Sequence, residues 1–168
     1  MLIFDKSDVI PNFRAVSAEL FRGGQPTHSG FQMLKERGIR TVVNFRDEPP
    51  LISVEQRILD ALGLDFISIP LSPFREPTHK EVEQFLEIIS CSEAQPLFVH
   101  CLHGQDRTGA MVCIYRMAAS GWGFDEAYAE MVESGFHAEF HHLRRAVLRF
   151  ASRKGVFGGR TKMLSPAP

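Results

Sequence analysis

The sequence of 168 residues, 44% hydrophobic and 23% charged, has the length and composition of one ordinary globular domain. Its net charge of −1 argues against the basic surface of a nucleic-acid-binding protein. Three cysteines are too few for a disulfide framework, and no apolar run reaches the ~18 residues that a membrane-spanning helix needs.

Short strands alternate with helices in the first half of the chain. Residues 39–45 are dense in β-branched side chains, which favour a strand. Thr27 is a suitable N-cap for the helix before this strand, and Ser53 with Gln56 fits a capping box for the helix after it. The expected elements are a strand at 20–26, a helix at 27–38, a strand at 39–45, a helix at 53–63 and a strand at 65–70.

The second half continues the alternation and ends in helices. Thr78 and Glu81 form another capping-box pattern ahead of an apolar helical face. The expected elements are a helix from 78 through 89, a strand at 97–99, a helix opened at 107–109 and running to 119, and helices at 124–134 and 139–151. This order predicts a three-layer α/β fold with a short, mostly parallel central sheet flanked by helices. We expect one domain over residues 1–153 and a flexible tail over 154–168.

The most informative stretch runs from Pro96 to Gly109. A buried strand ends at His100 and Cys101, a five-residue loop follows, and Arg107 opens a helix. A tight loop that leads into a helix N-terminus directs backbone N–H groups at one point and adds the partial positive charge of the helix dipole. The stretch therefore predicts an anion cradle with a cysteine at its base.

The chemistry predicted for this cradle is phosphoryl transfer to sulfur. Amide donors, a helix N-terminus and a guanidinium around Cys101 favour its thiolate, which is a nucleophile. Arg107 can bind two oxygens of a phosphoryl group, and Thr108 can donate its hydroxyl to the sulfur when the thiolate leaves. Such a reactive thiolate also suits a reducing compartment.

The pattern His100-Cys101-x5-Arg107-Thr108 resembles the signature of the cysteine-dependent protein tyrosine phosphatase superfamily. The short chain is most similar to the compact atypical dual-specificity branch, which includes phytase-like phosphatases of inositol polyphosphates. The resemblance implies a protein tyrosine phosphatase-like fold and a phosphatase domain that works through cysteinyl-phosphate. It assigns catalysis to Cys101, Arg107 and Asp106, and support of the nucleophile to His100. The residues assigned to phosphate binding are Leu102, His103, Gly104, Gln105, Asp106, Arg107 and Thr108.

Two carboxyl groups compete for the role of general acid. In this superfamily an aspartate on a loop before the signature commonly donates the proton, but the corresponding loop, 71–77, contains only Glu76. Asp106 lies beside Arg107, where a bound phosphate would favour the protonated carboxyl group. An arrangement of this kind is similar to phosphoinositide phosphatases of the myotubularin and Sac types. Asp106 could instead hold Arg107 or a backbone amide by hydrogen bonding.

Cations on the loops suggest the substrate. Arg46, Arg75 and Lys80, with His79 and His103, fall in loops or helix starts on the expected active face. They are candidate substrate-mouth residues for a highly charged ring, which favours inositol polyphosphates. A protein tyrosine or dual-specificity phosphatase is the alternative, and a pseudo-phosphatase that only binds phosphorylated ligands is disfavoured by the intact signature.

No cofactor and no metal are expected. His137, His141 and His142 cluster in the sequence, but no cysteine or carboxylate completes a metal-binding set with them. Cys91 and Cys113 suit the core. The expected partner is a small anionic phosphorylated substrate or a phosphoprotein, without nucleic acid or membrane span, and the chain is expected to be a monomer. The default location is the cytoplasm, or a secreted or periplasmic one if a signal peptide has been removed.

Overall fold

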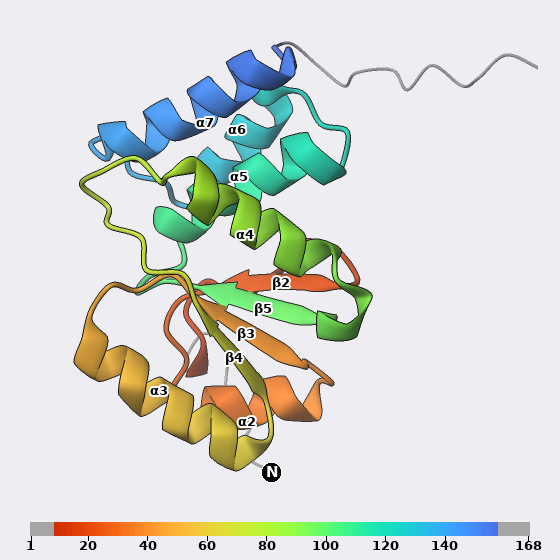
Figure 1. Ribbon diagram of the computed structural model, residues 1–168, viewed down its shortest axis with the longest axis vertical. Helices are drawn as coiled ribbons and strands as arrows, with labels where there is room; N and C mark the ends of the chain where they lie inside the picture. The colour runs from red at the N-terminus through yellow and green to blue at the C-terminus, as the bar shows by residue number, and fades with distance from the viewer. Residues whose placement is uncertain (1–8, 158–168) are drawn as a thin grey trace, which may run out of the picture.

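A five-stranded sheet forms the centre of the molecule, for which the computed structural model describes residues 9–157 (Figure 1). The strands lie in the order β1-β2-β5-β3-β4, and all neighbouring pairs are parallel except β1 with β2. Their bounds are β1 Arg14–Ala15, β2 Leu20–Gly23, β3 Thr41–Asn44, β4 Asp65–Ser68 and β5 Leu97–His100. The short β1 was not predicted from the sequence. The signature strand β5 lies in the middle of the sheet, so its C-terminal end is flanked by β2 and β3.

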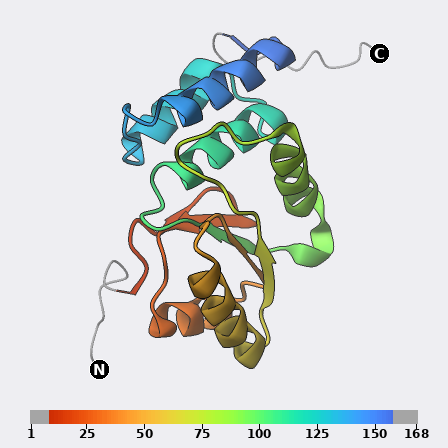
Figure 2. The same cartoon turned by 60° about the vertical axis from the view of Figure 1, so that its left-hand side comes forward.

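Helices cover both faces of this sheet. The bounds are α2 His28–Glu36, α3 Pro49–Leu62, α4 His79–Ser90, the 3₁₀ helix η1 Ser92–Ala94, α5 Arg107–Ala119, α6 Phe124–Glu133 and α7 His141–Lys154. α2 and α3 lie on one face, and α4 to α7 lie on the other (Figures 1 and 2). Along β5, Leu97 and Val99 join the core under α4 to α7, whereas Phe98 joins the core under α2 and α3. The predicted three-layer α/β fold is confirmed.

The start of α3 differs from the prediction. The helix begins at Pro49, where proline suits the first turn because its missing N–H needs no partner there. Ser53 therefore lies inside the helix, and its hydroxyl donates to the Pro49 carbonyl instead of capping. The capping box at Thr78 and Glu81 is present as predicted, with both of its hydrogen bonds formed.

The end of the chain is ordered for longer than predicted. α7 includes Lys154, and Val156 packs against the main core and accepts a hydrogen bond from the Phe124 amide at 2.8 Å. The remainder of the predicted tail, 158–168, lies outside the described residues, as do residues 1–8. Over the part of the chain that is described, no helix has the length and apolar character to cross a membrane.

Candidate active site

Cys101 lies at the carboxyl end of β5, at the edge of a parallel sheet where ligands commonly bind. Only 3% of the residue is exposed. It lies at a cavity of about 200 Å³, which the 71–77 loop, the signature loop and the start of α7 enclose together. The lining residues are Pro73, Phe74, Cys101, Leu102, His103, Asp106, Arg107 and Phe140. Of the other predicted phosphate-binding residues, Gly104, Thr108 and the half-buried Gln105 do not line it.

Gly104 allows the loop to turn tightly against β2. Its φ of +72° lies in the left-handed region, which costs a residue with a Cβ about 1–2 kcal/mol. A Cβ at this position would also lie 2.2 Å from the Gly23 carbonyl carbon, so the two backbones can approach this closely only through glycine. The loop conformation therefore depends on this residue.

We expect Gly104→Ala to lower the free energy of unfolding by more than the ~1–2 kcal/mol of left-handed strain, and to weaken orthovanadate binding. Gly121→Ala is the matched control, because Gly121 has nearly the same φ, +70°, with nothing within 4 Å of an added Cβ. Denaturant unfolding and vanadate inhibition measure both effects. Equal losses in the two variants would show that the approach to Gly23 does not matter.

Three successive carbonyl groups of the loop are held from outside. The Leu102 carbonyl accepts from the backbone N–H of Gln25 at 2.9 Å, that of His103 from the Asn12 side chain at 3.0 Å, and that of Gly104 from an Arg22 Nη at 2.8 Å. In a planar trans peptide the N–H points opposite to the carbonyl. The N–H groups of residues 103, 104 and 105 therefore face the inside of the loop, and none of them donates to another described residue. This is the backbone arrangement that the predicted anion cradle requires.

Asp47 holds the signature arginine. Arg107 is 8% exposed, and one Nη donates to Asp47 at 2.7 Å and to the Leu71 carbonyl at 3.1 Å. Arg107 also lines the cavity that contains Cys101, so these two contacts fix a side chain of that cavity. Sequence reasoning missed Asp47, although it lies just beyond β3, at the sheet edge where ligands collect.

His100 supports the nucleophile through a hydrogen bond to its backbone. Its ring is fully buried, with Nδ1 3.1 Å from the Cys101 carbonyl oxygen and Nε2 2.7 Å from a carboxylate oxygen of Glu55. The other Glu55 oxygen accepts from Gln25 at 2.8 Å. His100 therefore anchors the backbone of the nucleophile and makes no bond to its sulfur. Sequence reasoning also missed Glu55, although its spacing from Leu59 and Leu62 places it on the inward face of α3.

The two candidate acids have different surroundings. Asp106 lines the cavity beside Cys101, and its carboxylate accepts from the His137 backbone N–H at 2.8 Å and lies 3.1 Å from His137 Nδ1. Glu76 does not line that cavity, and its carboxylate lies 3.2–3.3 Å from the guanidinium groups of Arg145 and Arg149. Position therefore favours Asp106 as the candidate acid. Of the two structural roles considered for Asp106, it binds a backbone amide, that of His137, whereas Arg107 is bound by Asp47.

Thr108 and Cys113 are buried residues of α5. The Thr108 hydroxyl is buried and has no hydrogen-bond partner among the described residues, so the predicted bond to the Cys101 sulfur is not formed. Burial raises the pKa of the Cys113 thiol to about 12, as suits the core position predicted for it, while Cys91 is only partly buried.

The predicted substrate-mouth cations do not surround the cavity. Arg46 is 8% exposed and pairs with Glu48 at 2.8 Å, an interaction that lowers the pKa of Glu48 to about 2 and raises the pKa of Arg46. Arg75 pairs with Glu81, and Lys80 is exposed on the first turn of α4. Acidic neighbours bind two of the three charges, and none of the three residues lines the Cys101 cavity, so their contact with substrate stays a prediction.

The histidine cluster is not assembled as a metal site. Over residues 9–157, no group of three or more histidine, cysteine, aspartate or glutamate side chains is placed to hold a metal ion. His137 contacts Asp106, and His142 lies 2.6 Å from a guanidinium nitrogen of Arg145.

Comparison with known proteins places the chain in a family. Residues 6–142 match the model described as "DSP-PTPase phosphatase fused to NAD+ Kinase". NAD kinase 2 of Arabidopsis thaliana chloroplasts is 38% identical over 96 residues, and the dual specificity protein phosphatase TpbA of Pseudomonas aeruginosa is 25% identical over 128 residues. These matches cover 55% and 76% of this chain, but only 10% and 56% of the two relatives.

Solved structures of phosphatases share the fold. The crystal structure of TpbA in complex with pTyr has a TM-score of 0.71 and 22% identity, covering 92% of this chain and 94% of that one. The catalytic core of the PP-IP phosphatase SIW14 from S. cerevisiae, in complex with citrate, has a TM-score of 0.68 and 23% identity, covering 91% and 99%.

Proposed function

This chain belongs to the DSP-PTPase family of phosphatase domains, and we propose that it hydrolyses phosphomonoesters through a cysteinyl-phosphate intermediate. The observation that carries the proposal is the loop that surrounds Cys101. Its N–H groups at 103, 104 and 105 face inward, and Arg107 is held at its mouth, so a phosphoryl group would find its donors already in place.

The reaction would proceed in two steps. The Cys101 sulfur attacks phosphorus, the bond from phosphorus to the leaving oxygen breaks, and Asp106 donates its proton to that oxygen. Water then attacks phosphorus and gives a proton to Asp106, the sulfur–phosphorus bond breaks, and inorganic phosphate and the thiolate are released. Asp106 is proposed as the acid because it shares the cavity with Cys101, whereas Glu76 does not.

The walls of the cavity favour an aryl phosphate such as phosphotyrosine. Pro73, Phe74 and Phe140 are apolar, and the rings of Phe74 and Phe140 lie 6.3 Å apart. Apolar and aromatic walls gain free energy from burying a ring and little from the hydroxyl-bearing face of a sugar or an inositol. The relative TpbA is named a dual specificity protein phosphatase, which is consistent with this choice.

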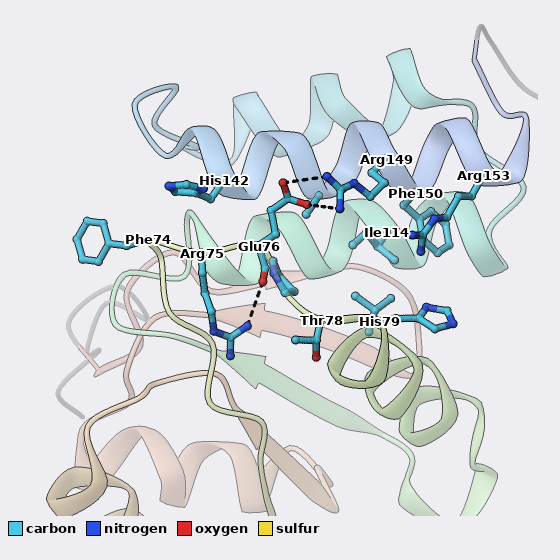
Figure 3. A pocket seen from close by; sticks show the side chains of 13 residues that line it. Phe74, Arg75, Glu76, Thr78, His79, Ile114, His142, Arg149, Phe150 and Arg153 are labelled. Atoms are coloured by element: carbon cyan, nitrogen blue, oxygen red, sulfur yellow. Dashed lines mark hydrogen bonds and ion pairs between the residues drawn. The ribbon is translucent and has the colours of Figure 1, made fainter.

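Inositol polyphosphates are the second candidate, because a basic cavity adjoins the first. It has a volume of about 430 Å³, shares Phe74 with the Cys101 cavity, and is lined by Arg75, Arg149 and Arg153, among other residues (Figure 3). Arg149 is occupied by Glu76 there, and Arg153 has no ion pair with any described residue. A substrate with several phosphates could place one of them in this cavity. The structural neighbour SIW14 is named a PP-IP phosphatase, which is consistent with such a substrate.

Two variants distinguish the candidates. For an aryl phosphatase, Phe140→Leu should lower kcat/KM for a phosphotyrosine peptide about threefold to tenfold, the value of an aromatic pair, and Arg153→Gln should have no effect. For an inositol polyphosphate phosphatase, Arg153→Gln should lower kcat/KM for inositol hexakisphosphate, with Phe140→Leu the neutral control. Binding of orthovanadate without turnover of either substrate would contradict the proposed hydrolysis and favour a pseudo-phosphatase.

A further inference from the structure

We infer that Arg22 is a positioning residue for the reaction proposed above: it fixes the Gly104 peptide and supplies a buried positive charge behind Cys101. Arg107 and Arg22 would then act on opposite sides of the same loop. Arg107 faces the cavity that receives the phosphate, whereas Arg22 does not line that cavity. The inference rests on the proposed phosphatase function.

The position of Arg22 is unusual for a charged residue. It lies on β2, in register with Val99 of the parallel strand β5, and its strand face is that of Leu20. Leu20 and Val99 both belong to the core under α4 to α7. Arginine is almost never buried at such a position unless its charge is used, yet Arg22 is only 3% exposed.

The contacts of the guanidinium point to the loop. One Nη donates to the Gly104 carbonyl at 2.8 Å, whereas Nε and the other Nη have no hydrogen-bond partner among the described residues. The donating Nη lies 3.6 Å from the place where a Cβ on Gly109 would be, so the absence of a side chain there gives it room beside the first turn of α5. Arg22 thus lies between the strand before the loop and the helix after it.

The charges around Arg22 do not neutralise it through direct contact. Cys101, Glu130, Arg14 and Arg116 act on it electrostatically, and Glu130 is already held by Arg116 at 2.6–2.9 Å. Burial lowers the pKa of Arg22 to about 10, which still leaves the guanidinium protonated at neutral pH. A buried charge without a close ionic partner reduces the stability of the fold.

The burial of this charge despite its cost in stability indicates a functional role, and the contact with the signature loop shows what that role would be. A thiolate at Cys101 would be a negative charge near Arg22 in addition to Glu130, and a buried cation lowers the free energy of such a thiolate more than a solvated one would. The bond to Gly104 also turns the following N–H, that of Gln105, into the cradle, because the peptide is planar. The positive charge favours both the nucleophilic thiolate and a bound phosphate, and the oriented N–H supplies the phosphate with a donor.

Arg22→Met removes the charge and the donors while keeping an unbranched apolar stem at this buried position. We expect it to lower kcat/KM for p-nitrophenyl phosphate and to weaken orthovanadate inhibition, each about 10-fold to 100-fold, with Tm unchanged or raised. Arg22→Lys keeps a charge and one donor, and should recover most of both losses. Arg14→Met is the control, because Arg14 lies opposite Arg22 in the register of β1 and β2 but its side chain is exposed.

Each outcome decides the question. Wild-type values in Arg22→Met, or no recovery in Arg22→Lys, would overturn the inference. A large fall in Tm in Arg22→Met would overturn it as well, because Arg22 would then act through folding. Absence of turnover in the unmodified protein would instead contradict the proposed function. The two failures are therefore distinguishable.

Discussion

Replacing Cys101 with serine is expected to abolish phosphomonoester hydrolysis, with kcat falling at least about 10⁴-fold, as when the nucleophile of a covalent mechanism is removed. A serine hydroxyl is far less acidic than a thiol, so it would need a general base to become a nucleophile. His100 is fully buried and bound to Glu55 and to the Cys101 carbonyl, so it cannot accept the hydroxyl proton. Stopped-flow and steady-state release of p-nitrophenol from p-nitrophenyl phosphate measure the loss.

Binding should survive the same substitution. The cradle amides are fixed by Gln25, Asn12 and Arg22 and not by the sulfur, so Cys101→Ser should still bind phosphate, as calorimetry can test. Cys91→Ser is the matched control, since Cys91 lies at the end of α4 and should tolerate the change with full activity. Turnover within tenfold of the unmodified protein in Cys101→Ser would exclude cysteinyl-phosphate.

The parts of the site that are local in sequence were predictable. Cys101, the loop and Arg107 lie within seven residues, and a strand followed by a glycine turn and a helix N-terminus fixes their arrangement through backbone geometry alone. The capping box that opens α4 and the glycine that ends α3 are also local, and both were found. Features that are set by neighbouring residues can be predicted without knowledge of the tertiary structure.

The residues that hold the loop in place were not predictable in this way. Asn12, Arg22 and Asp47 meet the loop across 91, 82 and 60 residues of sequence. The sequence gives their charge or polarity but not their partner. Arg46 is likewise held by a distant residue, because one Nη donates to the Gln25 side-chain oxygen at 3.1 Å across 21 residues, in addition to its local ion pair with Glu48.

Asp106→Asn should reveal the general acid by its dependence on the leaving group. The cavity places Asp106 beside Cys101, so its carboxyl group can reach the oxygen that departs from phosphorus. A phenol with no activating group leaves poorly as its anion, whereas p-nitrophenolate leaves readily. We therefore expect kcat to fall about 10²- to 10⁴-fold for phosphotyrosine, the range of general acid catalysis, and less than about tenfold for p-nitrophenyl phosphate.

The two substrates share an aromatic ring, so they should occupy the cavity alike, and the comparison isolates proton transfer from binding. Glu76→Gln is the control. Its carboxylate is bound to Arg145 and Arg149 on α7, so the change should leave both rates nearly unaltered.

Equal losses for both substrates in Asp106→Asn would mean that Asp106 acts by holding the His137 amide, because misplacing the phosphoryl group slows every leaving group alike. A selective loss in Glu76→Gln would transfer the role of acid to the 71–77 loop, and would require that loop to release α7 before each turnover.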